Sequence, residues 1–74
     1  MRYRFISGKT RDKRIRAILV EKGWSMSEFA RRLQRTRDAV FRSMRADDPR
    51  ISTITQFAHV LGVSTNYLIN KDLD

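Results

Sequence analysis

Arginine side chains that could recognise an anion gather between Gly23 and Arg45 of this chain. A guanidinium carries a planar fork of N–H donors, which matches a phosphate group or the O6/N7 edge of guanine. The outer face of a short helix near the end of this stretch would carry Arg37, Asp38, Phe41, Arg42 and Arg45. Val40 and Met44 lie four residues apart, so they can hold that helix against a partner helix. A short, basic, outward-facing helix suits the reading of a DNA groove.

Cap signals place a second helix directly before this one. Ser25 and Glu28 have the S-x-x-E spacing of a capping box, in which the hydroxyl accepts from an early N–H and the carboxylate reaches back. Trp24 and Phe29 have the spacing of a hydrophobic staple. Thr36 is the N-cap candidate for the basic helix. The sequence therefore predicts helices over about 26–33 and 37–45, separated by a sharp break.

Helix signals elsewhere predict the elements that must position this pair. A first helix should begin near Thr10 or Asp12, end at Lys22 and be closed by Gly23. Another should begin around Ser52 or Thr53 and end at Leu61 before Gly62, and Ser64 should cap a last helix from Thr65 to about Ile69. Because there is no clear strand pattern, we expect a compact all-α fold of five helices in one domain, residues 10–74.

Residues 1–9 are expected to form a basic N-terminal arm, with a short strand or an extra helical turn as alternatives. Such an arm could lie on a DNA backbone or in a minor groove. Packing of Tyr3 and Phe5 against the domain is an equal alternative.

Charge is distributed unevenly along the 74 residues, whose formal net charge is +8. Residues 1–16 hold seven basic side chains and one acidic, and residues 31–45 hold six and one. Residues 51–74 hold one basic and two acidic side chains. This polarity favours a polyanion partner on one face, whereas the plainer alternative is a basic surface that only aids solubility.

Other functional classes find little support in the sequence. There is no cysteine, so disulfides and thiolate metal sites are excluded. His59 is the single histidine, the adjacent Asp47 and Asp48 do not converge, and no Gly-rich phosphate loop is present. We expect no enzyme, metal or cofactor. Without a membrane span or signal peptide, the expected setting is the cytoplasm of a bacterium, chromosomal or phage-encoded, with the protein on the nucleoid when bound.

Four motifs between Trp24 and Leu68 have the order and spacing of a known family, and the resemblance extends over about Ile15–Ile69: W-S-M-S-E-F-A-R-R-L, T-R-D-A-V, P-R-I and F-A-H-V-L-G-V-S-T-N-Y-L. Through them the chain resembles the helix-turn-helix family of phage lambda-type repressors, Cro proteins and xenobiotic-response-element regulators. The resemblance implies a lambda-repressor-like domain.

The chain also departs from the family pattern. Gln34 stands where the family usually has a turn glycine, so it must adopt the turn conformation, for which a positive φ is one option. Leu19 and Met44 stand where many members carry an arginine and a glutamate, and Met26 replaces a glutamine that often contacts phosphate. Ala46 replaces a glycine that commonly ends the recognition helix.

The resemblance implies roles for individual residues. Base readout would fall to Thr36, Arg37, Asp38, Phe41 and Arg42. Backbone contacts would come from Ser25, Arg31, Arg32, Arg35, Arg45 and Arg50. Arg37 and then Arg42 are the first candidates for guanine. Asp38 could accept from cytosine N4, orient one of these arginines, or simply favour the helix N-terminus. Phe41 would either contact a thymine methyl or pack inward.

The expected function is that of a sequence-specific regulator of transcription on double-stranded DNA, with repression favoured over activation. Family members of this size usually read an inverted repeat as homodimers. The candidate interface is Asn66, Tyr67, Leu68 and Ile69, although core packing explains Leu68 equally well. Two alternatives stay open: an antitoxin that binds a toxin as well as its own promoter, and a nonspecific nucleic-acid binder.

Overall fold

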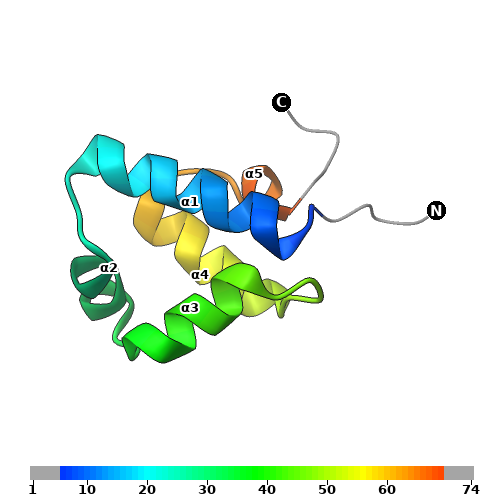
Figure 1. Cartoon of the computed structure of the whole chain (residues 1–74). Helices are drawn as coiled ribbons and strands as arrows, with labels where there is room; N and C mark the ends of the chain where they lie inside the picture. Colours follow the sequence, from blue (N-terminus) through cyan, green and yellow to red (C-terminus); the bar gives the residue numbers. More distant parts are fainter. Residues whose placement is uncertain (1–5, 70–74) are drawn as a thin grey trace.

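The computed structural model of the chain describes residues 6–69, which fold into five helices without a strand (Figure 1). The helices are α1 (Gly8–Lys22), α2 (Met26–Leu33), α3 (Arg37–Arg45), α4 (Ile51–Leu61) and α5 (Thr65–Ile69). α1 packs directly on α3, α2 contacts both α3 and α4, and α5 packs on α1 and α4. The two ends of the described chain meet, because the Ile6 N–H donates to the carbonyl oxygen of Ile69 at 2.9 Å. The expected all-α fold is confirmed.

Apolar side chains from all five helices form one continuous core. Its largest members include Phe29 of α2 and Phe57 of α4, which are fully buried and meet edge to face with their ring centroids 5.4 Å apart. Ile15, Val40 and Leu68 bring α1, α3 and α5 onto the same cluster. Each such side chain contributes about 1.5–3 kcal/mol through removal from water. This core fixes the short helices, which would be marginal alone.

Local capping sets the helix ends, largely where the sequence predicts them. α2, α3 and α5 have the predicted bounds, and Gly23 (φ 70°) and Gly62 (φ 77°) close α1 and α4 in the left-handed conformation. α4 begins one residue earlier than predicted, at Ile51. α1 begins at Gly8 rather than at Thr10 or Asp12, because the Ser7 hydroxyl accepts from the Thr10 N–H at 3.1 Å and caps the helix.

Part of the predicted N-terminal arm therefore belongs to the packed structure. Ile6 is buried, Ser7 is the N-cap of α1, and Gly8 and Lys9 lie in the helix. Residues 1–5, including Tyr3 and Phe5, lie outside the described residues, so both alternatives for them stay predictions. Among residues 6–69, none of the helices has the length and apolar character needed to cross a membrane.

The N-terminus of α1 lies directly against the C-terminal end of α3. The Gly8 N–H donates to Oδ1 of Asp47 at 2.8 Å, so a carboxylate satisfies an N–H that the helix itself leaves unpaired. A Cβ atom at Gly8 would lie 1.7 Å from the carbonyl oxygen of Arg45. Glycine is thus the residue that lets these two backbones approach so closely.

Arg11 joins the same two helix ends from the inside. Its side chain is fully buried and donates to the carbonyl oxygens of Met44 (3.2 Å) and Ala46 (2.5 Å) at the end of α3. It also donates to Leu68 O (3.0 Å) and Ile6 O (3.3 Å). Burial lowers the pKa of Arg11, and the nearby Asp47 carboxylate partly offsets this shift. Gly8, Arg11 and residues 44–47 form a contact that we call the α1–α3 joint.

Candidate nucleic-acid interface

A tight turn at Gln34 joins α2 to α3 and sets the angle between them. Gln34 has φ 58° and ψ 42°, in the left-handed region that glycine usually occupies. The Gln34 N–H donates to Arg31 O and the Arg35 N–H to Ala30 O, both at 3.0 Å, which satisfies the last carbonyls of α2. Gln34 thus takes the turn conformation for which the sequence offered a positive φ as one option.

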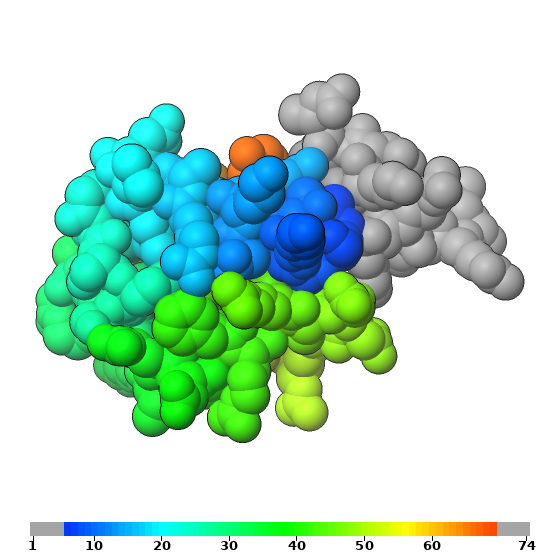
Figure 2. All heavy atoms as spheres, in the orientation of Figure 1, coloured from blue at the N-terminus to red at the C-terminus, as the bar shows by residue number. Residues whose placement is uncertain are grey.

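α3 buries one face and leaves the other open. Thr36 caps it by accepting from the Ala39 N–H at 3.1 Å, and Val40 and Met44 are fully buried in the core. The outer face carries the exposed side chains of Arg37, Asp38, Arg42 and Arg45 and the half-buried ring of Phe41. Figure 2 shows the side chains of α3 projecting from the lower edge of the molecule. The predicted base-readout residues therefore lie together on one accessible strip.

Phe41 does not take the inward-packed position that was one of its two predicted alternatives, and its contact with a thymine methyl stays a prediction. It is half-buried and lies outside the core, so it does not pack inward. The guanidinium of Arg16, from α1, lies 5.4 Å from its ring centroid. Phe41 also lines a surface hollow of about 360 Å³ with Arg42, Arg45 and Ala46. Its exposed ring surface remains available for an apolar contact.

Glu28 binds two arginines of its own helix. Its carboxylate accepts from Arg31 at 2.6 Å and pairs with Arg32 at 2.7 Å. Half of the predicted capping box is formed, since Ser25 Oγ accepts from the Glu28 N–H at 3.1 Å. The return bond from Ser25 N–H to the Glu28 carboxylate is not made, because charge-assisted bonds to guanidinium groups are stronger. The Arg31 hydrogen bond is also the main cause that lowers the pKa of Glu28.

Other predicted contact residues are held by neutral partners or stand alone. Arg35 donates twice to Gln56 Oε1, at 3.0 and 2.8 Å, and Arg37 donates to Ser27 Oγ at 3.2 Å. Asp38 makes no ion pair with any residue in 6–69, so the structure does not show it orienting Arg37 or Arg42. Arg50 is exposed at the N-cap of α4.

The four candidate dimer residues fall into two groups. Leu68 and Ile69 are buried at 0% and 6% exposure, and core packing accounts for both. Asn66 is exposed. Tyr67 is half-buried, with the Arg14 guanidinium 4.9 Å from its ring centroid. Of the four candidates, only Asn66 and the open part of Tyr67 are therefore accessible to a partner.

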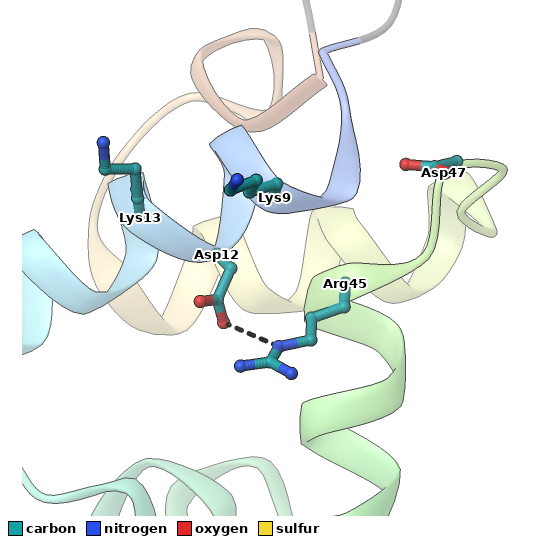
Figure 3. Close-up of a pocket in the computed structure, with 5 residues that line it drawn as sticks. All are labelled: Lys9, Asp12, Lys13, Arg45 and Asp47. Atoms are coloured by element: carbon teal, nitrogen blue, oxygen red, sulfur yellow. Dashed lines mark ion pairs between the residues drawn. The ribbon is translucent and has the colours of Figure 1, made fainter.

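α1 holds charged residues to which the sequence assigned no role. Lys9, Asp12 and Lys13 line a second surface hollow, of about 580 Å³, together with Arg45 and Asp47 (Figure 3). Arg11, Ile15 and Leu19 follow one another at intervals of four, so Arg11 lies on the buried stripe of the helix. That spacing could have indicated its burial from the sequence.

The arrangement offers recognition of an anionic surface rather than a cage for an ion. The outer face of α3 carries the exposed Arg37, Arg42 and Arg45 together with Asp38 and Phe41, and Arg16 of α1 lies over the Phe41 ring. Within residues 6–69, no group of three or more metal-ligating side chains could hold a metal ion. Comparison of the chain with protein-family models, curated proteins and solved structures finds no match in any of the three.

Proposed function

We propose that this protein is a sequence-specific regulator of transcription that binds double-stranded DNA through α2 and α3 as a helix-turn-helix. The observation that carries the proposal is the placement of α3. This helix is capped at its start, held by Val40 and Met44, and presents a row of arginines with Phe41 to solvent. A short helix supported in this way fits the width of the major groove.

Arg37 and Arg42 are the residues that would read bases. Arg37 lies at the first position of α3, the end of a recognition helix that reaches furthest into the groove. Arg42 lies five residues further along the same helix and has the length to reach a second base pair. Both can donate in a bidentate manner to guanine O6/N7. Phe41 between them would contact a thymine methyl group.

Ser25 and the arginines around α3 would position the protein without reading sequence. Contacts to phosphate oxygens fix the register of a protein on the duplex, and they carry no base information. The residues in this group are Ser25, Arg31, Arg32, Arg35, Arg45 and Arg50. Arg31 and Arg32 already share Glu28, so each would contribute part of its donor set.

Selection from a randomised duplex library tests the proposal directly. At about 150 mM salt with excess competitor DNA, purely electrostatic binding is suppressed, and we expect one sequence to be enriched. Arg37→Ala and Arg42→Ala should each relax the preference at one or two positions, with a loss of about 1–3 kcal/mol on the selected sequence. Arg14→Ala, on the side of α1 that faces α5, is the control that should keep the preference. Absence of any enrichment would refute sequence-specific reading.

We also propose that the protein acts as a homodimer on an inverted repeat and represses by occupying its operator. An enriched sequence with two half-sites about one DNA turn apart would support this. Sedimentation of the protein with and without that duplex gives the stoichiometry. One protomer per duplex, combined with a monomer in free solution, would contradict the dimer and leave the reading of sequence intact.

A further inference from the structure

One carboxylate on α1 holds two arginines that lie beside the outer face of α3. Asp12 is 9% exposed. Its Oδ2 atom lies 2.9 Å from Nε of Arg16, and its Oδ1 atom lies 3.8 Å from Nε of Arg45 (Figure 3 shows the second pair). The Oδ1 atom has no hydrogen-bond partner among residues 6–69, so the longer ion pair is its main compensation. Asp12 thus links α1 to the last turn of α3.

In both arginines the atom nearest to Asp12 is Nε, so the two terminal nitrogens of each guanidinium are not used in these ion pairs. Within residues 6–69, no group accepts a hydrogen bond from the terminal nitrogens of Arg16 or Arg45. The side chains are 42% and 65% exposed, so these donors are accessible. Arg16 is further restrained by its position over the Phe41 ring. A guanidinium held by one edge loses less freedom when its other edge binds an anion.

The residues that line the hollow beside this pair carry one more positive than negative charge. Its two carboxylates are both engaged, Asp47 by the Gly8 N–H and Asp12 by the arginines. Three cations, Lys9, Lys13 and Arg45, line the hollow together with these two carboxylates. Figure 3 shows that Lys9 and Lys13 come from α1 and that Arg45 comes from α3, on opposite sides of Asp12.

We propose that Arg16 and Arg45, held in place by Asp12, bind a backbone phosphate of the duplex read by α3, with Lys9 and Lys13 adding charge. This proposal rests on the proposed function and adds α1 to the interface. The DNA backbone is the favoured source of the phosphate because Arg45 lines this hollow and also the hollow that contains Phe41 and Arg42. The phosphate site is therefore continuous with the base-reading strip.

A pair of matched variants tests the role of Arg16. Arg16→Gln should weaken binding to every duplex by roughly tenfold and keep the sequence preference. The slope of log K against log salt should fall by about 0.9, the value for one phosphate contact. Arg14→Gln removes the same charge from the same helix, on the side facing α5. Because Arg14 also contacts Tyr67, the number of protomers on the duplex is measured for both variants, and at equal stoichiometry Arg14→Gln should leave the slope nearly unchanged. Equal effects of the two variants would overturn the proposal.

Asp12→Asn gives a second test, because two explanations predict opposite changes in the affinity for DNA. Removal of a negative charge near DNA should tighten binding if only long-range electrostatics matter. If Asp12 positions the two arginines, the same change weakens binding because they lose their fixed geometry. Circular dichroism reports whether each variant folds. Should Asp12→Asn fail to fold, the comparison of Arg16→Gln with Arg14→Gln decides the proposal alone.

Titration with inorganic phosphate at constant ionic strength separates the two sources of the anion. The side-chain Nε signals of Arg16 and Arg45 in nuclear magnetic resonance spectra should respond to the selected duplex and hardly to millimolar phosphate. A response to phosphate that the duplex does not displace would overturn the DNA assignment. If the wild-type protein binds no duplex at all, the proposed function itself is wrong. If the wild-type protein binds the duplex and the Arg16 and Asp12 variants bind it equally well, only the phosphate site is wrong.

Discussion

Gly8→Ala should destabilise the protein strongly, although glycine-to-alanine changes usually stabilise helices. Gly8 is the first residue of α1, where alanine would ordinarily be favoured by up to about 1 kcal/mol. The new Cβ would lie 1.7 Å from the carbonyl oxygen of Arg45 and 2.3 Å from its carbonyl carbon. Both are backbone atoms, so no side-chain rotation relieves the overlap. The two helix ends must separate by roughly 2 Å to reach ordinary contact.

The expected magnitude combines three terms. Overpacking costs about 1–3 kcal/mol. Loss of the 2.8 Å bond between the Gly8 N–H and the Asp47 carboxylate costs about 1.5–3 kcal/mol more. The higher helix propensity of alanine offsets up to about 1 kcal/mol of this loss. The net loss is therefore about 1.5–6 kcal/mol, a large fraction of the stability of a domain of this size.

Urea unfolding followed by circular dichroism and by Trp24 fluorescence measures this loss. Lys13→Ala, an exposed change in the same helix, is the control and should stay within about 0.5 kcal/mol. In the double variant with Asp47→Ala, the two losses should not add, because Gly8→Ala has already broken the bond that Asp47 accepts. A Gly8→Ala protein as stable as the wild type would refute the close approach of α1 and α3.

Three further predictions concern other parts of the molecule. Arg11→Met should lower the free energy of unfolding by at least about 1–3 kcal/mol, the cost of leaving one buried carbonyl without its donor, and an unchanged urea midpoint would contradict this. The pKa of Glu28 is lowered in the folded state, so its stabilisation is present above the ordinary glutamate pKa and is lost as pH falls through the lowered pKa. Thermal midpoints of wild type and Glu28→Gln between pH 6 and pH 3 should therefore converge toward the acid end, and parallel curves would contradict the pairing with Arg31. Gln34→Gly should raise the stability by about 0.5–1 kcal/mol, because glycine accepts φ 58° without strain, and a loss of stability in urea unfolding would refute this.

Local signals explain why much of the helical framework could be predicted from the sequence. Ser25, Thr36, Gly23 and Gly62 act on the helix next to them, so their neighbours in the chain contain the needed information. Ser7 is a cap of the same kind. It could not be identified from the sequence, because Gly8 follows it and a glycine usually indicates a turn rather than the first residue of a helix.

The unpredicted features depend on contacts between distant segments. Gly8 matters because the Arg45 backbone lies against it, and Glu28 prefers two arginines over its return bond. The apolar character of Leu68 and Ile69 is compatible with a core or an interface, and only the packed structure separates these alternatives. The orientation of Arg16 toward both Asp12 and Phe41 likewise requires α1 and α3 to be in place.

The α1–α3 joint has a consequence for the kinetics of folding. Arg11 contacts residues that are 33, 35 and 57 positions away in the chain, whereas the α2–α3 unit is built from neighbours. Contacts across long loops close late, since loop-closure entropy must be overcome before they form. Interactions that are absent from the transition state affect mainly the unfolding rate. We therefore expect changes at Gly8 and Arg11 to act mainly on the unfolding rate, and so to shorten the time for which α3 keeps its orientation.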